Sequence, residues 1–255
     1  MAKKVPFHVD YKTIGGINTI AEWILWVAVI IAALVLVLEA GYISDPTGIW
    51  QQRLNGVGCY LSIGYFIIDI ITNYLFQCAE AFRRNDFFDN SLNTVLADQT
   101  SEEYFTNDTI KEGIYKLGVN CFENSLFTKN IANRMVRPMF IKTLLVFFLF
   151  LAVAIFAGNK WLVIILQLAL PLTIIQQTVR LFYFQSRVDR VYEYFKRIFE
   201  MPVGDKQEHL LIHNVTNYEA ILAWATIKLD SRIFNEMNDK LSKDWAQIKQ
   251  RLNIK

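Results

Sequence analysis

Four long apolar runs constrain this chain more than any other feature, and they come as two pairs. The first pair is Trp23 to Ile43 and Val57 to Phe76, and the second is Met139 to Ala157 and Trp161 to Thr178. Each run has about 18 to 22 residues, enough at about 1.5 Å per helical residue to cross a hydrocarbon layer about 30 Å thick. Because a backbone inside lipid must satisfy its own hydrogen bonds, such runs are helices. The sequence therefore predicts an all-α membrane protein with four transmembrane helices in two hairpins.

Composition supports a membrane protein. Of the 255 residues, 53% are hydrophobic, against about 45–50% in a typical soluble chain. The first run begins too late and is too long for a cleavable signal peptide. The three cysteines, Cys59, Cys78 and Cys121, form no C-x-x-C pair, and we interpret them as small apolar side chains.

The distribution of basic residues predicts the orientation. Residues 1–19 hold three lysines, residues 83–142 hold eight Lys or Arg, and the chain from Arg180 onward holds thirteen. The two hairpin loops hold one each, Arg53 and Lys160. Because positive charge stays on the cytoplasmic side, we expect a multi-pass protein of the inner (plasma) membrane. Both termini and the middle segment are then cytoplasmic, and the hairpin tips lie outside.

Five segments follow from this pattern. They are a cytoplasmic N-terminal segment 1–20 with a flexible joint at Gly15-Gly16, a first transmembrane hairpin 21–84, a cytoplasmic linker domain 85–137, a second transmembrane hairpin 138–185, and a cytoplasmic helical tail 186–255.

Local signals predict the helices inside these segments. In the linker, Thr109 and Glu112 have capping-box spacing, which predicts a helix over residues 109–124. We also expect a second short helix over 125–136 and Pro138 at the start of span three. Span four continues as one helix to about Glu200. The apolar stripe of residues 206–255 predicts a helical tail packed against a partner helix.

Asp69 is the most unusual single residue, because it lies near the middle of span two. An ionisable group there is costly in lipid unless it faces protein or water. Polar residues extend the same face, and span four carries a matching set. If spans two and four start at Val57 and Trp161, equal depth pairs Asp69 with Thr173. The predicted polar stripe is Asp69, Asn73, Gln77 and Glu80 on span two, with Thr173, Gln176, Gln177 and Arg180 on span four.

The stripe has two interpretations. It lines a pore or ion path, or it forms interhelical hydrogen bonds that specify the packing of the spans. The residues alone leave both open.

No catalytic signature is present, so the sequence predicts no enzyme. It lacks a G-x-G-x-x-G, a P-loop, a G-x-S-x-G and an H-E-x-x-H. His209 and His213 have metal-ligand spacing, but no cysteine lies near them and Glu208 is the only adjacent acid, so we predict no metal site and no cofactor. We also expect no direct nucleic-acid binding.

Three stretches of the middle segment, residues 83–91, 103–108 and 116–129, resemble the cytoplasmic linker of small bacterial multi-span membrane proteins found with defence systems. These include the SMODS-associating four-span and SLOG-associating two-span effector families. The resemblance implies an anti-phage effector that permeabilises the inner membrane and answers a cytoplasmic protein partner or a nucleotide signal. The corresponding partner or trigger surface would comprise Asp89, Asn90, Tyr104, Asn120, Glu123 and Asn124.

Three functions therefore compete. The first is a homo-oligomeric, pore-forming effector or sensor of antiviral defence, triggered from the cytoplasm. The second is a small channel or transporter subunit with Asp69 as an ion-coupling acid. The third is a non-catalytic membrane anchor or scaffold that recruits a soluble partner.

Overall fold

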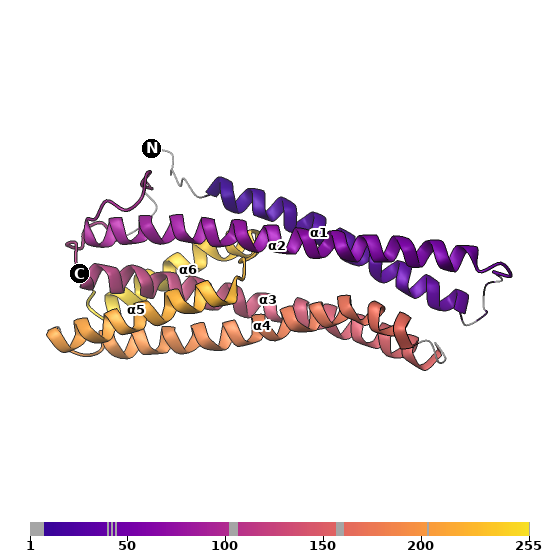
Figure 1. The fold of residues 1–255 in the computed structure, drawn as a ribbon. Helices are drawn as coiled ribbons and strands as arrows, with labels where there is room; N and C mark the ends of the chain where they lie inside the picture. Colours follow the sequence, from indigo (N-terminus) through magenta and orange to yellow (C-terminus); the bar gives the residue numbers. More distant parts are fainter. Residues whose placement is uncertain are drawn as a thin grey trace. The chain divides into compact units, whose positions relative to one another are not determined.

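The computed structural model describes residues 8–39, 41, 43, 45–101, 107–156, 161–202 and 204–254, and their side chains except those of 8, 9, 36, 39, 149, 150, 152–156 and 161–171. Every regular element in these ranges is an α-helix, which confirms the predicted all-α class (Figure 1). The helices are α1 His8–Glu39, α2 Ile49–Leu92, α3 Ile114–Phe156, α4 Trp161–Phe199, α5 Asp205–Ala225 and α6 Ser231–Arg251.

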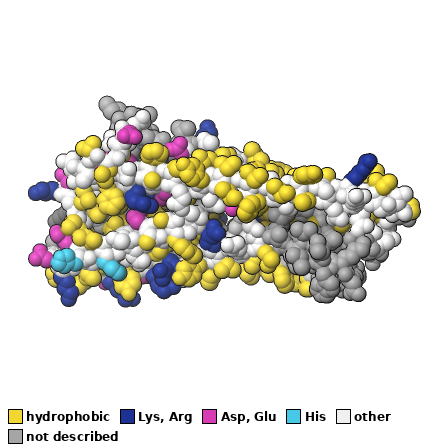
Figure 2. Space-filling model, viewed as in Figure 1, with side chains coloured by type: hydrophobic (Ala, Val, Ile, Leu, Met, Phe, Trp, Pro, Cys, Tyr) yellow, Lys and Arg dark blue, Asp and Glu magenta, His cyan; other side chains and the backbone are white. Residues whose placement is uncertain are grey.

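The chain folds as two compact units, and α1, α2, α3 and α4 each contribute to both. The apolar unit comprises Lys12–Leu75 and Arg137–Val179, and the polar unit comprises Met1–Tyr11, Phe76–Val136 and Arg180–Lys255. On the face drawn in Figure 2, most charged side chains lie over the polar unit. Hydrophobic side chains cover much of α1 and α2 in the apolar unit.

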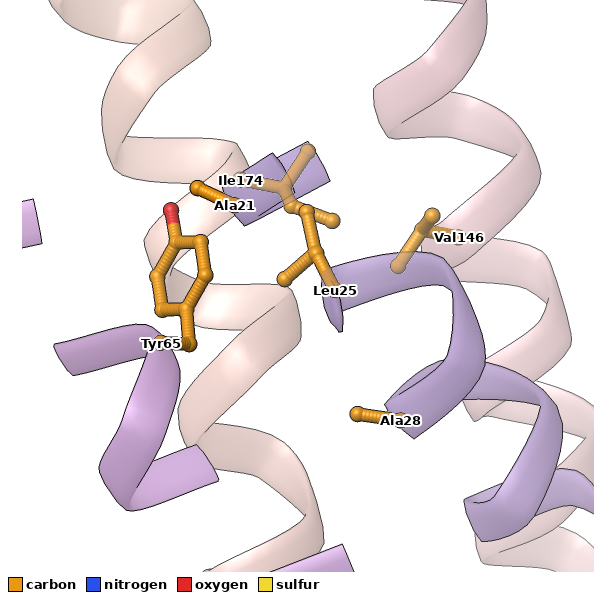
Figure 3. Packing of buried hydrophobic residues seen from close by; sticks show 6 residues of the cluster. All are labelled: Ala21, Leu25, Ala28, Tyr65, Val146 and Ile174. Carbon is orange, nitrogen blue, oxygen red and sulfur yellow. The ribbon is translucent and has the colours of Figure 1, made fainter. Parts of the chain in front are cut away.

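All four helices of the apolar unit contribute to its core. Figure 3 shows the cluster of Ala21, Leu25 and Ala28 from α1, Tyr65 from α2, Val146 from α3 and Ile174 from α4. The two alanines of α1 allow close approach of the neighbouring backbones, as small residues do in helix packing within membranes.

The helices α1 and α2 are long and apolar enough to cross a membrane, by length and composition. Only 22% and 6% of their most apolar stretches are buried. On α1 the exposed apolar side chains recur every three or four residues and so form one outward stripe: Ile20, Trp23, Val27, Ile30, Leu34 and Val37. A helix of a soluble protein buries such a stripe in its core.

Among the described residues, there are therefore two candidate spans, α1 and α2, rather than the predicted four. The second predicted pair falls on α3 and α4. Side chains of residues 149, 150, 152–156 and 161–171 in these helices lie outside the described part.

Aromatic side chains build the core of the polar unit. The Phe122 ring stacks on that of Phe199 with a centroid distance of 5.4 Å and contacts those of Tyr192 and Trp245 at 5.3 Å each. These residues come from α3, α4 and α6. The tail helices thus pack on partner helices, as their apolar stripe predicts.

Two predicted boundaries are wrong. Helix α1 begins at His8 and passes through Gly15-Gly16, so no flexible joint interrupts it. The predicted short linker helices and span three form the single helix α3, which contains Pro138. Proline removes one backbone hydrogen bond but keeps a helical φ, so the helix can continue through it.

Glycine, rather than the capping box, sets the start of α3. Gly113 has φ +146°, a conformation that other residues rarely adopt, and its N–H donates to the carbonyl of Ser91 at 2.9 Å. The tail is also interrupted. Thr226 ends α5 with φ 48°, and the Asp230 carboxylate accepts from the N–H of Arg232 to begin α6.

Gly118 offers a test of the packing between α3 and α5. A Cβ at this position would lie 2.6 Å from Cδ2 of the fully buried Leu211. We expect Gly118→Ala to lower the free energy of unfolding by about 1–3 kcal/mol, because added volume strains a packed core. Chemical denaturation of the purified protein measures this change.

Gly64 in α2 is the matched control, because a Cβ there meets no atom within 4 Å. Gly64→Ala should be neutral or stabilise by about 0.5–1 kcal/mol. In the double variant, Leu211→Ala should relieve part of the loss caused by Gly118→Ala. Additive losses would show that Gly118 and Leu211 do not clash.

Candidate functional site

A network of buried charges joins α2 to α5 within the polar unit. The Arg83 guanidinium donates to Glu80 at 2.8 Å and to Glu219 at 2.6 Å. Arg84 donates to the same Glu219 oxygen at 3.2 Å. The hydroxyl of Tyr11 in α1 donates to the other Glu80 oxygen at 2.5 Å. Three helices therefore meet through two carboxylates and two guanidinium groups.

This network is shielded from water. The side chains of Arg83, Glu80 and Glu219 are only 14%, 8% and 10% exposed. Burial by itself lowers the pKa of the Arg83 guanidinium, but the adjacent carboxylates of Glu80 and Glu219 raise it well above its ordinary value. Arg83 is therefore permanently charged, and its position depends on both carboxylates.

The parts of α2 and α4 that belong to the polar unit also contact the C-terminal end of α5. Gln77 of α2 donates to the Ala223 carbonyl at 3.0 Å. Arg180 of α4 donates to the Thr226 hydroxyl at 3.3 Å. The last carbonyls of a helix have no partner within it, and Gln77 supplies a donor to one of them. Gln77, Glu80 and Arg180 of the predicted polar stripe thus belong to the polar unit.

The rest of the stripe forms separate pairs in the apolar unit. Asn73 donates to the Asp69 carboxylate at 3.0 Å, one turn along α2. Gln177 of α4 donates to the Tyr65 hydroxyl at 2.8 Å. Asp69 is half-buried, as are Thr173 and Gln177, whereas Gln176 is exposed.

The hydrogen bond between Tyr65 and Gln177 aligns α2 with α4 at this point. Both residues lie sixteen positions after the first residue of their helix, Ile49 in α2 and Trp161 in α4. The pairing of Asp69 with Thr173, which counts span two from Val57, stays a prediction.

Two of the residues predicted as a trigger surface, Asp89 and Asn120, are buried, and Asn90 and Glu123 are half-buried. Asn120 is buried, accepts from Asn107 at 2.9 Å, and donates to Asn90 and Ser91 at 3.0 Å each. Asn107 also donates to Glu123 at 2.7 Å. Amides both donate and accept, so a buried cluster of them can satisfy itself. These residues therefore connect α2, α3 and the preceding loop from inside.

The remaining predicted surface residues have different surroundings. Asp89 is buried and accepts from Thr94 and from the N–H groups of Leu96 and Ala97, each at 2.8 Å. Burial raises the pKa of Asp89, but these hydrogen bonds outweigh it and lower the pKa below its ordinary value. Asn124 is half-buried, and Tyr104 lies outside the described residues.

A groove of about 530 Å³ lies between α3, α4 and α6 of the polar unit. Its lining includes Lys129, whose ammonium lies 2.7 Å from Asp189, 3.3 Å from Glu193 and 4.2 Å from the centre of the Tyr192 ring. Burial lowers the pKa of Lys129, but the two carboxylates raise it above its ordinary value. The lysine charge is therefore balanced within the groove wall.

Sequence reasoning missed Arg83, Glu219 and Tyr11 as members of one network. One signal was present for Glu219. It follows Tyr218 in the apolar stripe of α5, so it lies at the edge of the helix face that packs into the core. A charge at such a position needs a partner. The identity of that partner depends on how α2 packs against α5, which local spacing does not reveal.

No group of three or more His, Cys, Asp or Glu residues able to hold a metal ion occurs among the described side chains. Comparisons with protein-family models, with curated proteins and with solved structures find no match to this chain.

The buried network predicts a strong asymmetry between two carboxylates. Glu219→Ala leaves Arg83 and Arg84 without a shared partner, so we expect a loss of about 3–5 kcal/mol in the free energy of unfolding. Glu193→Ala removes a side chain that is 43% exposed, and should cost about 0–1 kcal/mol. Denaturation of the two variants in the same detergent provides the measurement.

The triple variant Glu80→Gln, Arg83→Met and Glu219→Leu supplies the second arm. It removes the three buried charges together, so it should be more stable than Glu219→Ala alone. Equal losses from Glu219→Ala and Glu193→Ala would contradict the role of the network.

Proposed function

We propose that this chain is a membrane-embedded effector or sensor of bacterial anti-phage defence, which assembles as a homo-oligomer and permeabilises the inner membrane when triggered from the cytoplasm. One observation carries the proposal. Helix α2 continues unbroken from a stretch with exposed apolar side chains into the buried charge network of the polar unit. The defence context rests on the resemblance of the middle segment.

The membrane arrangement that we propose has four spans in two hairpins. Aromatic and basic residues pair near both ends of the apolar unit, as is typical of residues at membrane interfaces. The Lys142 ammonium lies 5.7 Å from the centre of the Trp26 ring, and the Arg53 guanidinium lies 5.9 Å from that of Trp50. With both termini cytoplasmic, Trp26 marks the inner interface and Trp50 the outer one.

The topology predicts a clear labelling pattern. In a cysteine-free background, a cysteine at Thr47 in the hairpin tip should react with a membrane-impermeant maleimide added outside intact spheroplasts. A cysteine at Asp98 in the polar unit should react only after permeabilisation. Both positions are exposed, which makes them a matched pair. Labelling of Asp98→Cys from outside intact cells would overturn the topology.

The proposed switch depends on helix continuity. Asp69 and Arg83 lie fourteen residues apart on α2, about 21 Å along one helix. A trigger that binds the polar unit differently in two states would shift the equilibrium between them. The contacts of Arg83, Gln77 and Arg180 with α5 are the part of the polar unit nearest to the spans in sequence. A change in them would therefore act directly on α2 and α4.

Any pore would form between copies. The core of the apolar unit is filled by apolar side chains of all four helices. A bundle this small has little room for an aqueous path of its own. Spans two and four, which carry Asp69 and Gln177, would then line the path between subunits.

Asp69→Leu tests whether the stripe conducts or packs. If it lines a path, the variant should keep its oligomeric state in mild detergent while ion flux into proteoliposomes falls at least tenfold. If it only packs, oligomer stability and flux should fall together. Asp98→Leu, which replaces an exposed acid of the polar unit, should change neither.

Two further outcomes separate the competing functions. A strictly monomeric chain with full cellular activity would contradict the proposed assembly. A wild-type chain that gives no flux in its triggered state yet retains a soluble partner on the membrane would favour the scaffold.

A further inference from the structure

An exposed aromatic and basic cluster lies where α4 meets the C-terminal end of α5 in the polar unit. The rings of Tyr183 and Trp224 contact edge to face with centroids 5.2 Å apart. The Arg187 guanidinium lies 5.6 Å from the centre of the Tyr183 ring. Trp224 is 59% exposed and Tyr183 is 45% exposed. An exposed cluster of apolar side chains, unlike a single one, marks a candidate site for a protein or membrane partner.

The position of Trp224 is fixed rather than accidental. Its neighbours Ala223 and Thr226 accept hydrogen bonds from Gln77 and Arg180. Trp224 therefore stands in the last turn of a helix that α2 and α4 both hold.

The depth of the cluster follows from the proposed membrane arrangement, on which this inference rests. Thr143 and Thr178 share a hydrogen bond of 2.5 Å between α3 and α4. Lys142, at the proposed inner interface beside Trp26, precedes Thr143 by one residue. Tyr183 follows Thr178 by five residues of the same helix, about 7.5 Å. The polar headgroup layer on each side of a bilayer is about 5–7.5 Å thick, so Tyr183 falls at its edge.

We propose that Tyr183, Arg187 and Trp224 form a binding site for the phosphate headgroup of an anionic phospholipid in the inner leaflet. The Arg187 guanidinium pairs with the phosphate, and the two rings lie in the headgroup layer, where tyrosine and tryptophan are favoured. In the described part of the chain, Arg187 forms no ion pair with a carboxylate. Its charge is therefore available to the lipid.

The same helix contains a matched control. Tyr194 is 56% exposed, and the Arg197 guanidinium lies 6.0 Å from the centre of its ring. This pair has the same chemistry as Tyr183 and Arg187. It lies sixteen residues beyond Thr178, about 24 Å along α4, which is outside the headgroup layer. Only the first pair should distinguish anionic from zwitterionic lipid.

The first experiment measures lipid binding to the full chain in detergent with short-chain phosphatidylglycerol and phosphatidylcholine as probes. The wild type should prefer phosphatidylglycerol. Arg187→Gln should weaken its binding about fivefold, the effect of one basic residue near an anionic surface. Arg197→Gln should bind as the wild type does. Equal binding by Arg187→Gln and the wild type, or equal losses in the two variants, would overturn the proposal.

The second experiment locates Trp224 in lipid vesicles and does not depend on removing a charge. Brominated phospholipids quench the fluorescence of nearby tryptophan. Trp224→Phe should therefore lose a smaller fraction of its fluorescence to these lipids than the wild type does. Trp245, which is 2% exposed in the polar core, should not be quenched, so Trp245→Phe should lose a larger fraction. Equal fractional quenching of the two variants would overturn the site.

A separate measurement identifies which proposal has failed. If the wild-type chain is released from vesicles by alkaline carbonate, both the membrane proposal and the lipid site fail. If it stays in the membrane while Trp224 is unquenched, only the lipid site fails.

Discussion

The buried guanidinium of Arg83 is the constraint on which the polar unit depends. A charge that is removed from water must find opposite charges nearby, and Arg83 finds two, Glu80 on its own helix and Glu219 on α5. This requirement fixes the rotation of α5 about its own axis and its position along α2. At that position, Gln77 and Arg180 form their hydrogen bonds with the end of α5. The aromatic core around Phe122 then fills the space between α3, α4 and α6.

The two units solve the problem of burying apolar surface in opposite ways. In the polar unit an aromatic core is closed off from solvent, and Phe122, Phe184 and Phe195 are fully buried. In the apolar unit a small core coexists with outward rows of apolar side chains, including Trp23 and Tyr60. Since one chain contains both patterns, hydropathy alone cannot describe it. The distinction lies in which face of each helix is apolar.

Sequence reasoning succeeded where the hydrophobic periodicity was strong and where proline and glycine mark the end of a helix. It predicted the helical class, the extension of α4 to about Glu200, and the break after that residue, because proline and glycine follow. It failed at Pro138, where local rules divide the chain into two helices but α3 continues through the proline. Asn120 was predicted on a surface, but its amide is satisfied inside the fold. Such pairings depend on distant helices, which the local sequence does not encode.

Cys121 gives the polar unit a built-in reporter of opening. Its thiol is fully buried in α3, and burial raises its pKa well above the ordinary value, so it is slow to form the reactive thiolate. Cys59, by contrast, is exposed. The native chain thus carries an exposed thiol at Cys59, a half-buried thiol at Cys78 and a protected thiol at Cys121, beside Phe122. The rate at which a small alkylating reagent reaches Cys121 would record how often the helices around it separate, with no added label.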